Sequence, residues 1–117
     1  MSVDNLTTRY RAEIALLSRY AINTAEIGST GGACKAIWAQ LPNGLRVAAS
    51  NGEMEREDYQ YWNLGIFHDH GGQLAYITAD TLDEQIAIAA ALTPAQVEAL
   101  LNGTTAIEAL PSNLIVL

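Results

Sequence analysis

The segment Tyr59–Ala79 reads YQYWNLGIFHDHGGQLAYITA, and it decides the expected fold. Two runs rich in β-branched and aromatic residues flank Asp69–Gly72, a turn-forming stretch that ends in two glycines. The pattern predicts a β-hairpin with strands at Tyr59–His68 and Gln73–Ala79. Both faces of the first strand are partly apolar, which favours an interior position in a sheet.

A second hairpin is expected upstream, from the strand-like runs Lys35–Leu41 and Leu45–Ser50. Between them, Pro42 fixes φ at the first corner of a turn and Gly44 accepts a positive φ. Together the two hairpins predict a four-stranded antiparallel sheet. Residues 23–34 (NTAEIGSTGGAC) are rich in turn formers and predict a loop or an irregular edge.

Apolar side chains recur every three or four residues over about residues 5–21, which predicts an amphipathic N-terminal helix. Glu13 falls inside its apolar arc, with Arg9 one turn earlier. A carboxylate at that position is expected to be paired or to lie at the rim of the core.

Two short C-terminal helices are predicted from their capping residues. Thr81–Glu84 fits a capping box, and Thr93–Gln96 repeats the device with a proline at the first helical position. The apolar segment Asn113–Leu117 is expected to dock as a strand at the sheet edge or across a dimer contact.

The 117 residues have the usual size of one domain. We therefore expect a single α+β domain over residues 1–117, with an N-terminal helix, a four-stranded antiparallel sheet of two hairpins and two short C-terminal helices. No apolar run reaches the roughly 20 residues that span a membrane. The lack of a signal-peptide pattern and the single cysteine, Cys34, favour a cytoplasmic protein in a reducing compartment.

Charge is segregated along the chain. Thirteen acidic residues oppose six basic ones, for a net charge of −7. All six bases lie in residues 1–56, whereas residues 57–117 carry eight acids and no base. Such a surface repels phosphate backbones, so direct nucleic-acid binding is not expected. It would attract a basic surface on a partner protein, although negative charge also serves solubility alone.

The leading interpretation is a non-enzymatic, acidic protein-interaction module that inhibits or regulates a basic protein, such as one that handles nucleic acid. Tyr and Trp are enriched at interface hot spots, and an aromatic cluster begins where the positive charge stops. The expected partner-binding residues are Glu57, Asp58, Tyr59 and Tyr61. Small anti-defence accessory proteins of phages and mobile elements share this size and charge, which is an analogy and not a sequence resemblance.

A small-ligand site is the first alternative. Trp38 and Arg46 lie on the two strands of the upstream hairpin, and an aromatic and a cationic side chain would together hold a nucleotide-like molecule. The alternative includes a homodimer that sequesters the ligand. The glycine-rich GSTGGACK lacks the Gly-Lys-Ser/Thr ending of a phosphate-binding loop, so no cofactor is expected there or elsewhere.

A metal-dependent enzyme is the second alternative. His68 and His70 are two residues apart, so on a strand both imidazoles would share a face and reach one ion. Zinc needs a further ligand, which Glu57, Asp58 or Cys34 would supply only if the fold brought it close. The simpler interpretation is an exposed polar turn. Nothing around Cys34 matches a nucleophile signature, so a small apolar role is expected for it.

Overall fold

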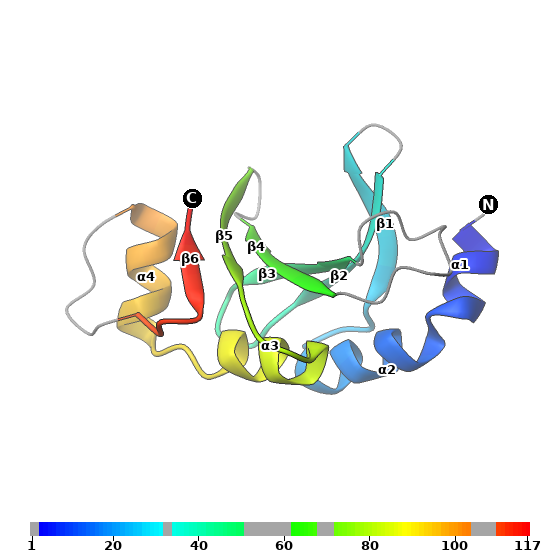
Figure 1. Cartoon of the computed structure of the whole chain (residues 1–117), viewed down its shortest axis with the longest axis horizontal. Coiled ribbons are helices and arrows are strands. Elements are labelled where there is room, and N and C mark those ends of the chain that lie inside the picture. The colour runs from blue at the N-terminus through cyan, green and yellow to red at the C-terminus, as the bar shows by residue number, and fades with distance from the viewer. Residues whose placement is uncertain (1–2, 32–33, 51–61, 68–71, 104–109) are drawn as a thin grey trace.

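An antiparallel six-stranded sheet with helices along one face makes up the protein (Figure 1). The computed structural model describes residues 3–31, 34–50, 62–67, 72–103 and 110–117. The helices are α1 (Val3–Arg9), α2 (Arg11–Tyr20), α3 (Leu82–Ala90) and α4 (Pro94–Asn102). The strands are β1 (Glu26–Gly31), β2 (Cys34–Gln40), β3 (Arg46–Ser50), β4 (Asn63–Phe67), β5 (Gln73–Ile77) and β6 (Leu114–Val116).

The strands pair in chain order, β1 to β6, and every neighbouring pair is antiparallel. Helices α3 and α4 lie between β5 and β6 in the chain. The register aligns one row of apolar residues across four strands, namely Ile37, Ala49, Leu64 and Ile77. Because side chains alternate between the faces of a strand, this row and its neighbours give the sheet one continuous apolar face.

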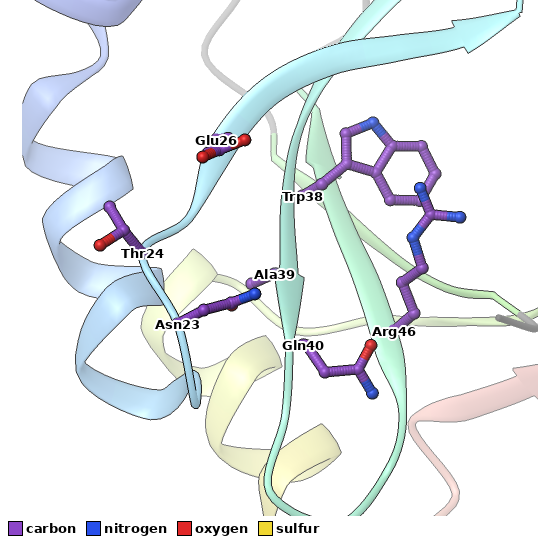
Figure 2. Close-up of a pocket in the computed structure, with 7 residues that line it drawn as sticks. All are labelled: Asn23, Thr24, Glu26, Trp38, Ala39, Gln40 and Arg46. Atoms are coloured by element: carbon purple, nitrogen blue, oxygen red, sulfur yellow. The ribbon is translucent and has the colours of Figure 1, made fainter.

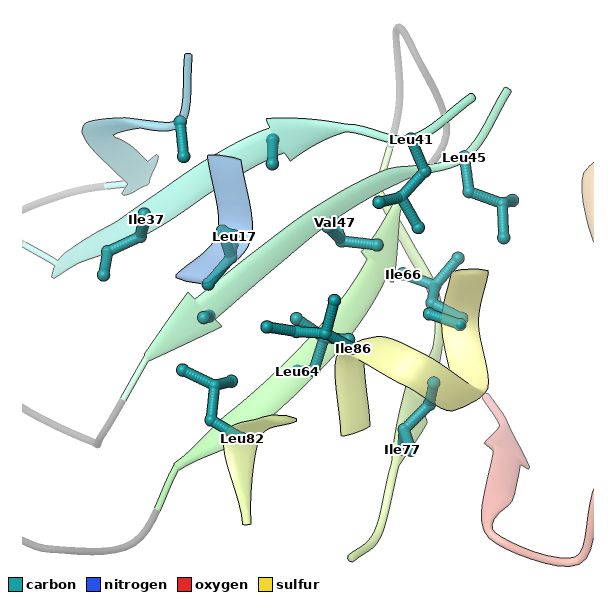
Figure 3. Packing of buried hydrophobic residues seen from close by; sticks show 14 of the residues in the cluster. Leu17, Ile37, Leu41, Leu45, Val47, Leu64, Ile66, Ile77, Leu82 and Ile86 are labelled. Atoms are coloured by element: carbon teal, nitrogen blue, oxygen red, sulfur yellow. The ribbon is translucent and has the colours of Figure 1, made fainter. Parts of the chain in front are cut away.

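The hydrophobic core lies between this face and the helices (Figure 3). Leu17 of α2 and Ile86 of α3 are fully buried against sheet residues such as Val47 and Leu64. Burying each such side chain contributes about 2 kcal/mol to folding. The core therefore fixes which face of the sheet the helices cover, and so which face they leave open.

One buried polar side chain ties the helices to the sheet. Gln85 of α3 is 2% exposed and donates hydrogen bonds to the carbonyl oxygens of Trp62 (2.9 Å) and Ala79 (3.0 Å). These two residues stand just before β4 and just after β5. Gln85 thus holds α3 across the ends of the central hairpin.

The predicted α+β class is confirmed, but the expectation of four strands is wrong, because the sheet has six. Residues 23–34, predicted as a loop or an irregular edge, contain the edge strand β1, whose register with β2 is irregular between Ser29 and Gly31. Gly28, one of the turn-forming residues in this segment, allows close packing between two strands. A Cβ at Gly28 would lie 2.9 Å from Cδ1 of Trp38 on the neighbouring strand. The sixth strand is β6, which pairs with β5, as expected for docking of the apolar C-terminal segment at the sheet edge.

The predicted N-terminal helix is present but divided at Tyr10, where φ is −103° and ψ is 26°. Tyr10 is buried, and its ring packs edge-on against Trp62 with centroids 5.6 Å apart. The break lets α1 and α2 take different directions around the sheet (Figure 1).

The predicted N-caps at Thr81 and Thr93 and the predicted turn at Gly44 are confirmed, but in the described structure only the cap at Thr93 forms the full capping box. Thr81 Oγ accepts a hydrogen bond from the Glu84 N–H, and Thr93 forms a reciprocal capping box with Gln96. In the β2–β3 turn, Gly44 has φ +92° and its N–H donates to the Leu41 carbonyl. No helix in the described ranges is long and apolar enough to cross a membrane.

Candidate functional site

The face of the sheet opposite the core carries polar and aromatic side chains. In the part of the chain that the structure describes, the helices contact the sheet from the core side and leave this face uncovered (Figure 1). Its central strands contribute Trp38, Gln40, Arg46, Ala48, Gly65 and Phe67. We call it the open face.

Arg46 and Trp38 form the centre of the open face. The guanidinium carbon of Arg46 lies 4.0 Å from the Trp38 ring centroid, which is a close cation–π contact. The register explains the contact, since Arg46 is opposite Gln40 and therefore diagonal to Trp38 on the same face. The ring of Phe67 meets Trp38 edge-on, with centroids 4.8 Å apart.

Two glycines make room for these aromatic side chains. A Cβ at Gly28 would lie 2.9 Å from Trp38, and one at Gly65 would lie 2.8 Å from Phe67. Neither glycine has a positive φ, so space and not backbone conformation requires them. The indole N–H of Trp38 is buried and has no hydrogen-bond partner among the described residues, so packing and the Arg46 contact hold the ring.

A hollow of about 370 Å³ adjoins the Arg46–Trp38 pair. Figure 2 shows its two walls, with Asn23, Thr24 and Glu26 on one side and Trp38, Ala39, Gln40 and Arg46 on the other. Its volume lies in the lower part of the range for small-molecule sites. We call it the Arg46–Trp38 hollow.

Hydrogen bonds fix the first wall of the hollow against α2 and β2. The Ile22 N–H donates to the Gln40 carbonyl (2.9 Å), and the Ala25 N–H donates to Ser18 Oγ (2.9 Å). Ser18 in turn donates to the Ile14 carbonyl (2.7 Å). The segment that carries Asn23 and Thr24 is therefore held at both ends, so the wall is preformed.

The two charges of the hollow lie on opposite walls. Within the described ranges, neither the Glu26 carboxylate nor the Arg46 guanidinium makes a hydrogen bond or an ion pair. Gln40 is partly engaged, since its amide donates to the Gly44 carbonyl (3.0 Å). The hollow therefore offers an acceptor on one side and a donor fork on the other.

A second hollow, of about 230 Å³, lies on the same face toward β5. Phe67 and Tyr76 contribute its aromatic walls, and Asn63, Ser50 and Gln73 its polar groups. The small residues Ala36, Ala48 and Gly65 also line it. No charged residue of the described chain lines it, so it has less capacity to select a charged ligand.

The structure brings together Trp38 and Arg46, the residues of the small-ligand alternative. The expected partner-binding residues Glu57, Asp58, Tyr59 and Tyr61 lie outside the described residues, as do His68 and His70. Cys34 is the first residue of β2. Across the ranges that are described, no group of three or more His, Cys, Asp or Glu residues is placed to hold a metal ion.

The residues that sequence reasoning missed are those of the first wall, Asn23, Thr24 and Glu26. They fall in residues 23–34, whose turn-forming composition predicts a loop or an irregular edge. They are joined to the site by the hydrogen bond from the Ile22 N–H to the Gln40 carbonyl and by the β1–β2 register, which places Glu26 opposite Trp38. That pairing spans 12 residues, and no local pattern in the sequence carries it.

Comparisons of this chain with protein-family models, with curated proteins and with solved structures gave no match. The function is therefore inferred from the geometry of the open face.

Proposed function

We propose that this chain is a binding protein that holds a small, planar, anionic molecule of the nucleotide-like class in the Arg46–Trp38 hollow. The observation that carries the proposal is the guanidinium of Arg46, stacked 4.0 Å from the Trp38 ring beside a hollow of about 370 Å³. A stacked guanidinium has already lost much of its freedom, so less entropy is lost when an anion binds it.

The charge of the protein limits how much negative charge the ligand can carry. Arg46 is the one cation among the described lining residues, and the chain as a whole carries −7. A highly charged anion would be repelled by the rest of the protein. A ligand with one or two negative charges and a flat body fits the hollow better.

The proposal is for binding and not for catalysis. Thr24 carries the single hydroxyl of the described lining, and it makes no hydrogen bond to a base there.

A thermal-shift screen followed by calorimetry with mononucleotides tests the proposal. We expect Arg46→Ala to weaken binding at least tenfold, which corresponds to about 1.4 kcal/mol. Arg46→Lys should restore only part of the affinity, because an ammonium keeps the charge but not the flat fork. The matched control is Arg11→Ala, since Arg11 is exposed on α2 and does not line the hollow. If no mononucleotide binds in an Arg46-dependent way, the proposal is wrong.

A second proposal is the acidic interaction module. It is favoured by the exposed acids Asp80, Asp83, Glu84 and Glu98, which lie in a stretch, residues 72–103, that has no base. Glu57, Asp58, Tyr59 and Tyr61 remain its proposed contacts with a basic partner. A co-purified basic protein should be lost in high salt, because exposed charges are screened. It should also be lost when those four residues are replaced together; retention would remove this surface from consideration.

A further inference from the structure

The two walls of the Arg46–Trp38 hollow differ in hydrogen-bonding character. An ionised carboxylate has no donor, and its two oxygens accept two parallel hydrogen bonds. Glu26 presents such a carboxylate, exposed and without a hydrogen bond or ion pair in the described structure. The first wall therefore suits a ligand edge with two adjacent N–H donors.

The second wall has the opposite character. The guanidinium of Arg46 only donates, and it suits a phosphate or carboxylate group. Figure 2 shows Glu26 on one side of Trp38 and Arg46 on the other. Glu26 is on β1 opposite Trp38, whereas Arg46 is on β3 opposite Gln40. Strand spacing and rise then place their Cα atoms roughly 12 Å apart.

A ligand that satisfies both walls needs paired N–H donors at one end, an anionic group at the other and a flat body between them. A flat body is favoured because the guanidinium of Arg46, which lies over the Trp38 ring, is itself planar and can take a second flat group on its outer face. Guanine has adjacent ring N–H and amino donors on one edge. Adenine offers an amino donor next to a ring acceptor, which would face the carboxylate with a lone pair.

We infer that the hollow takes a guanine nucleotide, with the paired donors of the ring on Glu26 and the phosphate on Arg46. This inference rests on the proposed ligand site. Glu26 is the residue that sets the choice of base. A site built to hydrogen-bond a particular group discriminates strongly against analogues that lack it.

Calorimetry with guanosine, inosine and adenosine monophosphates tests the inference. Inosine monophosphate is the matched ligand, because it keeps the ring N–H but lacks the amino group. We expect guanosine monophosphate to bind at least tenfold more tightly than adenosine monophosphate, with inosine monophosphate between them. Glu26→Gln replaces one acceptor by a donor, so it should bring the guanine-to-adenine ratio close to one.

The control variant is Glu84→Gln, which removes the same charge from an exposed position on α3 outside the hollow. It should leave the ratio unchanged. If Glu26→Gln did not fold, as judged by its thermal melt, the three ligands on the unmodified protein would still decide the matter.

The outcomes separate the inference from the proposed function. Arg46-dependent binding with equal affinity for guanine and adenine would overturn the guanine assignment and leave the ligand site standing. Absence of Arg46-dependent nucleotide binding would overturn both. Free arginine also has paired N–H donors and an anionic group but no purine ring; tighter binding of arginine than of guanosine monophosphate would overturn the guanine assignment.

Discussion

Gly28 of β1 lies beneath the indole of Trp38 on β2, so closely that a Cβ at position 28 would be 2.9 Å from Cδ1 of the ring. The same ring carries the Arg46 guanidinium on the open face. Gly28 on β1 thus helps to set the position of the Trp38 ring, and through that ring the position of Arg46 on β3. The contact between Gly28 and Trp38 therefore matters both for strand packing and for the proposed site.

We predict that Gly28→Ala displaces the Trp38 ring. Overpacking of this kind costs about 1–3 kcal/mol, so the melting temperature should fall. The Arg46–Trp38 contact should be lost with it, and nucleotide binding should weaken. Tryptophan fluorescence and a thermal melt would measure both effects.

The matched control is Gly72→Ala. Gly72 precedes β5, its φ is not positive, and a Cβ there would meet nothing within 4 Å. This variant should keep the fluorescence and affinity of the unmodified protein. Equal behaviour of the two variants would contradict the structural role given to Gly28.

Local sequence signals were sufficient for much of the fold. The turn at Gly44 and the caps at Thr81 and Thr93 are specified within four residues of chain, and all three are observed. For β1 the local signals predicted only a loop or an irregular edge, because the close packing that Gly28 allows involves Trp38 on another strand. Tyr10, where the N-terminal helix is divided, likewise packs on Trp62, which is 52 residues away. Contacts of this range leave no periodic pattern in the sequence.

The candidate site was predictable only in part, for the same reason. Trp38 and Arg46 lie on one predicted hairpin, so their proximity followed from the turn between them. Glu26 completes the hollow only through the β1–β2 register. The sequence therefore indicates the two candidate residues that the β2–β3 turn brings together, Trp38 and Arg46, but not Glu26 on β1.

The ligand's charge should control its affinity. A single guanidinium serves the anionic group, and the chain carries −7. We therefore predict that guanosine triphosphate binds more weakly than the monophosphate, and that the singly charged cyclic monophosphate binds at least as well as the monophosphate. Calorimetry at two salt concentrations would measure this order. The penalty for the triphosphate should shrink as salt screens the long-range repulsion; an affinity that rises with each added phosphate would contradict it.

The β2–β3 turn is fastened to α3 by Asn43. Its side-chain amide donates to the Ala89 carbonyl (2.9 Å), and its oxygen accepts from the Leu45 N–H (3.2 Å). We predict that Asn43→Ala lowers the free energy of unfolding by about 1–2 kcal/mol, measured by urea denaturation.

The variant Asn43→Asp tests the two hydrogen bonds separately, because it keeps one and removes the other. A carboxylate still accepts from Leu45 but cannot donate to Ala89, whose carbonyl lies near the negative end of the α3 dipole. At neutral pH this variant should be at least as unstable as Asn43→Ala. It should recover in mild acid, where a protonated carboxyl donates again. The same stability for Asn43→Asp at both pH values would exclude the bond to Ala89 as the cause.

The pH dependence of stability tests whether Glu13 on α2 is partly buried. Partial burial raises the pKa of its carboxyl above 4.5, and a hydrogen bond to its own backbone opposes the rise. The folded state therefore holds the proton more tightly than the unfolded chain does. This favourable contribution is complete below the unfolded pKa and is lost as the pH rises through the folded pKa. At pH 7 the carboxylate thus destabilises the fold.

We predict that Glu13→Gln raises the stability at pH 7, by less than about 1 kcal/mol because the side chain remains partly solvated. The difference between variant and unmodified protein should disappear below about pH 4, where the carboxyl is protonated in both states. Thermal melts of both proteins at a series of pH values would measure this difference in stability. Since the cause is burial and not a neighbouring charge, the gain at pH 7 should persist in 1 M salt. A gain that salt abolishes would instead assign the effect to charges around Glu13.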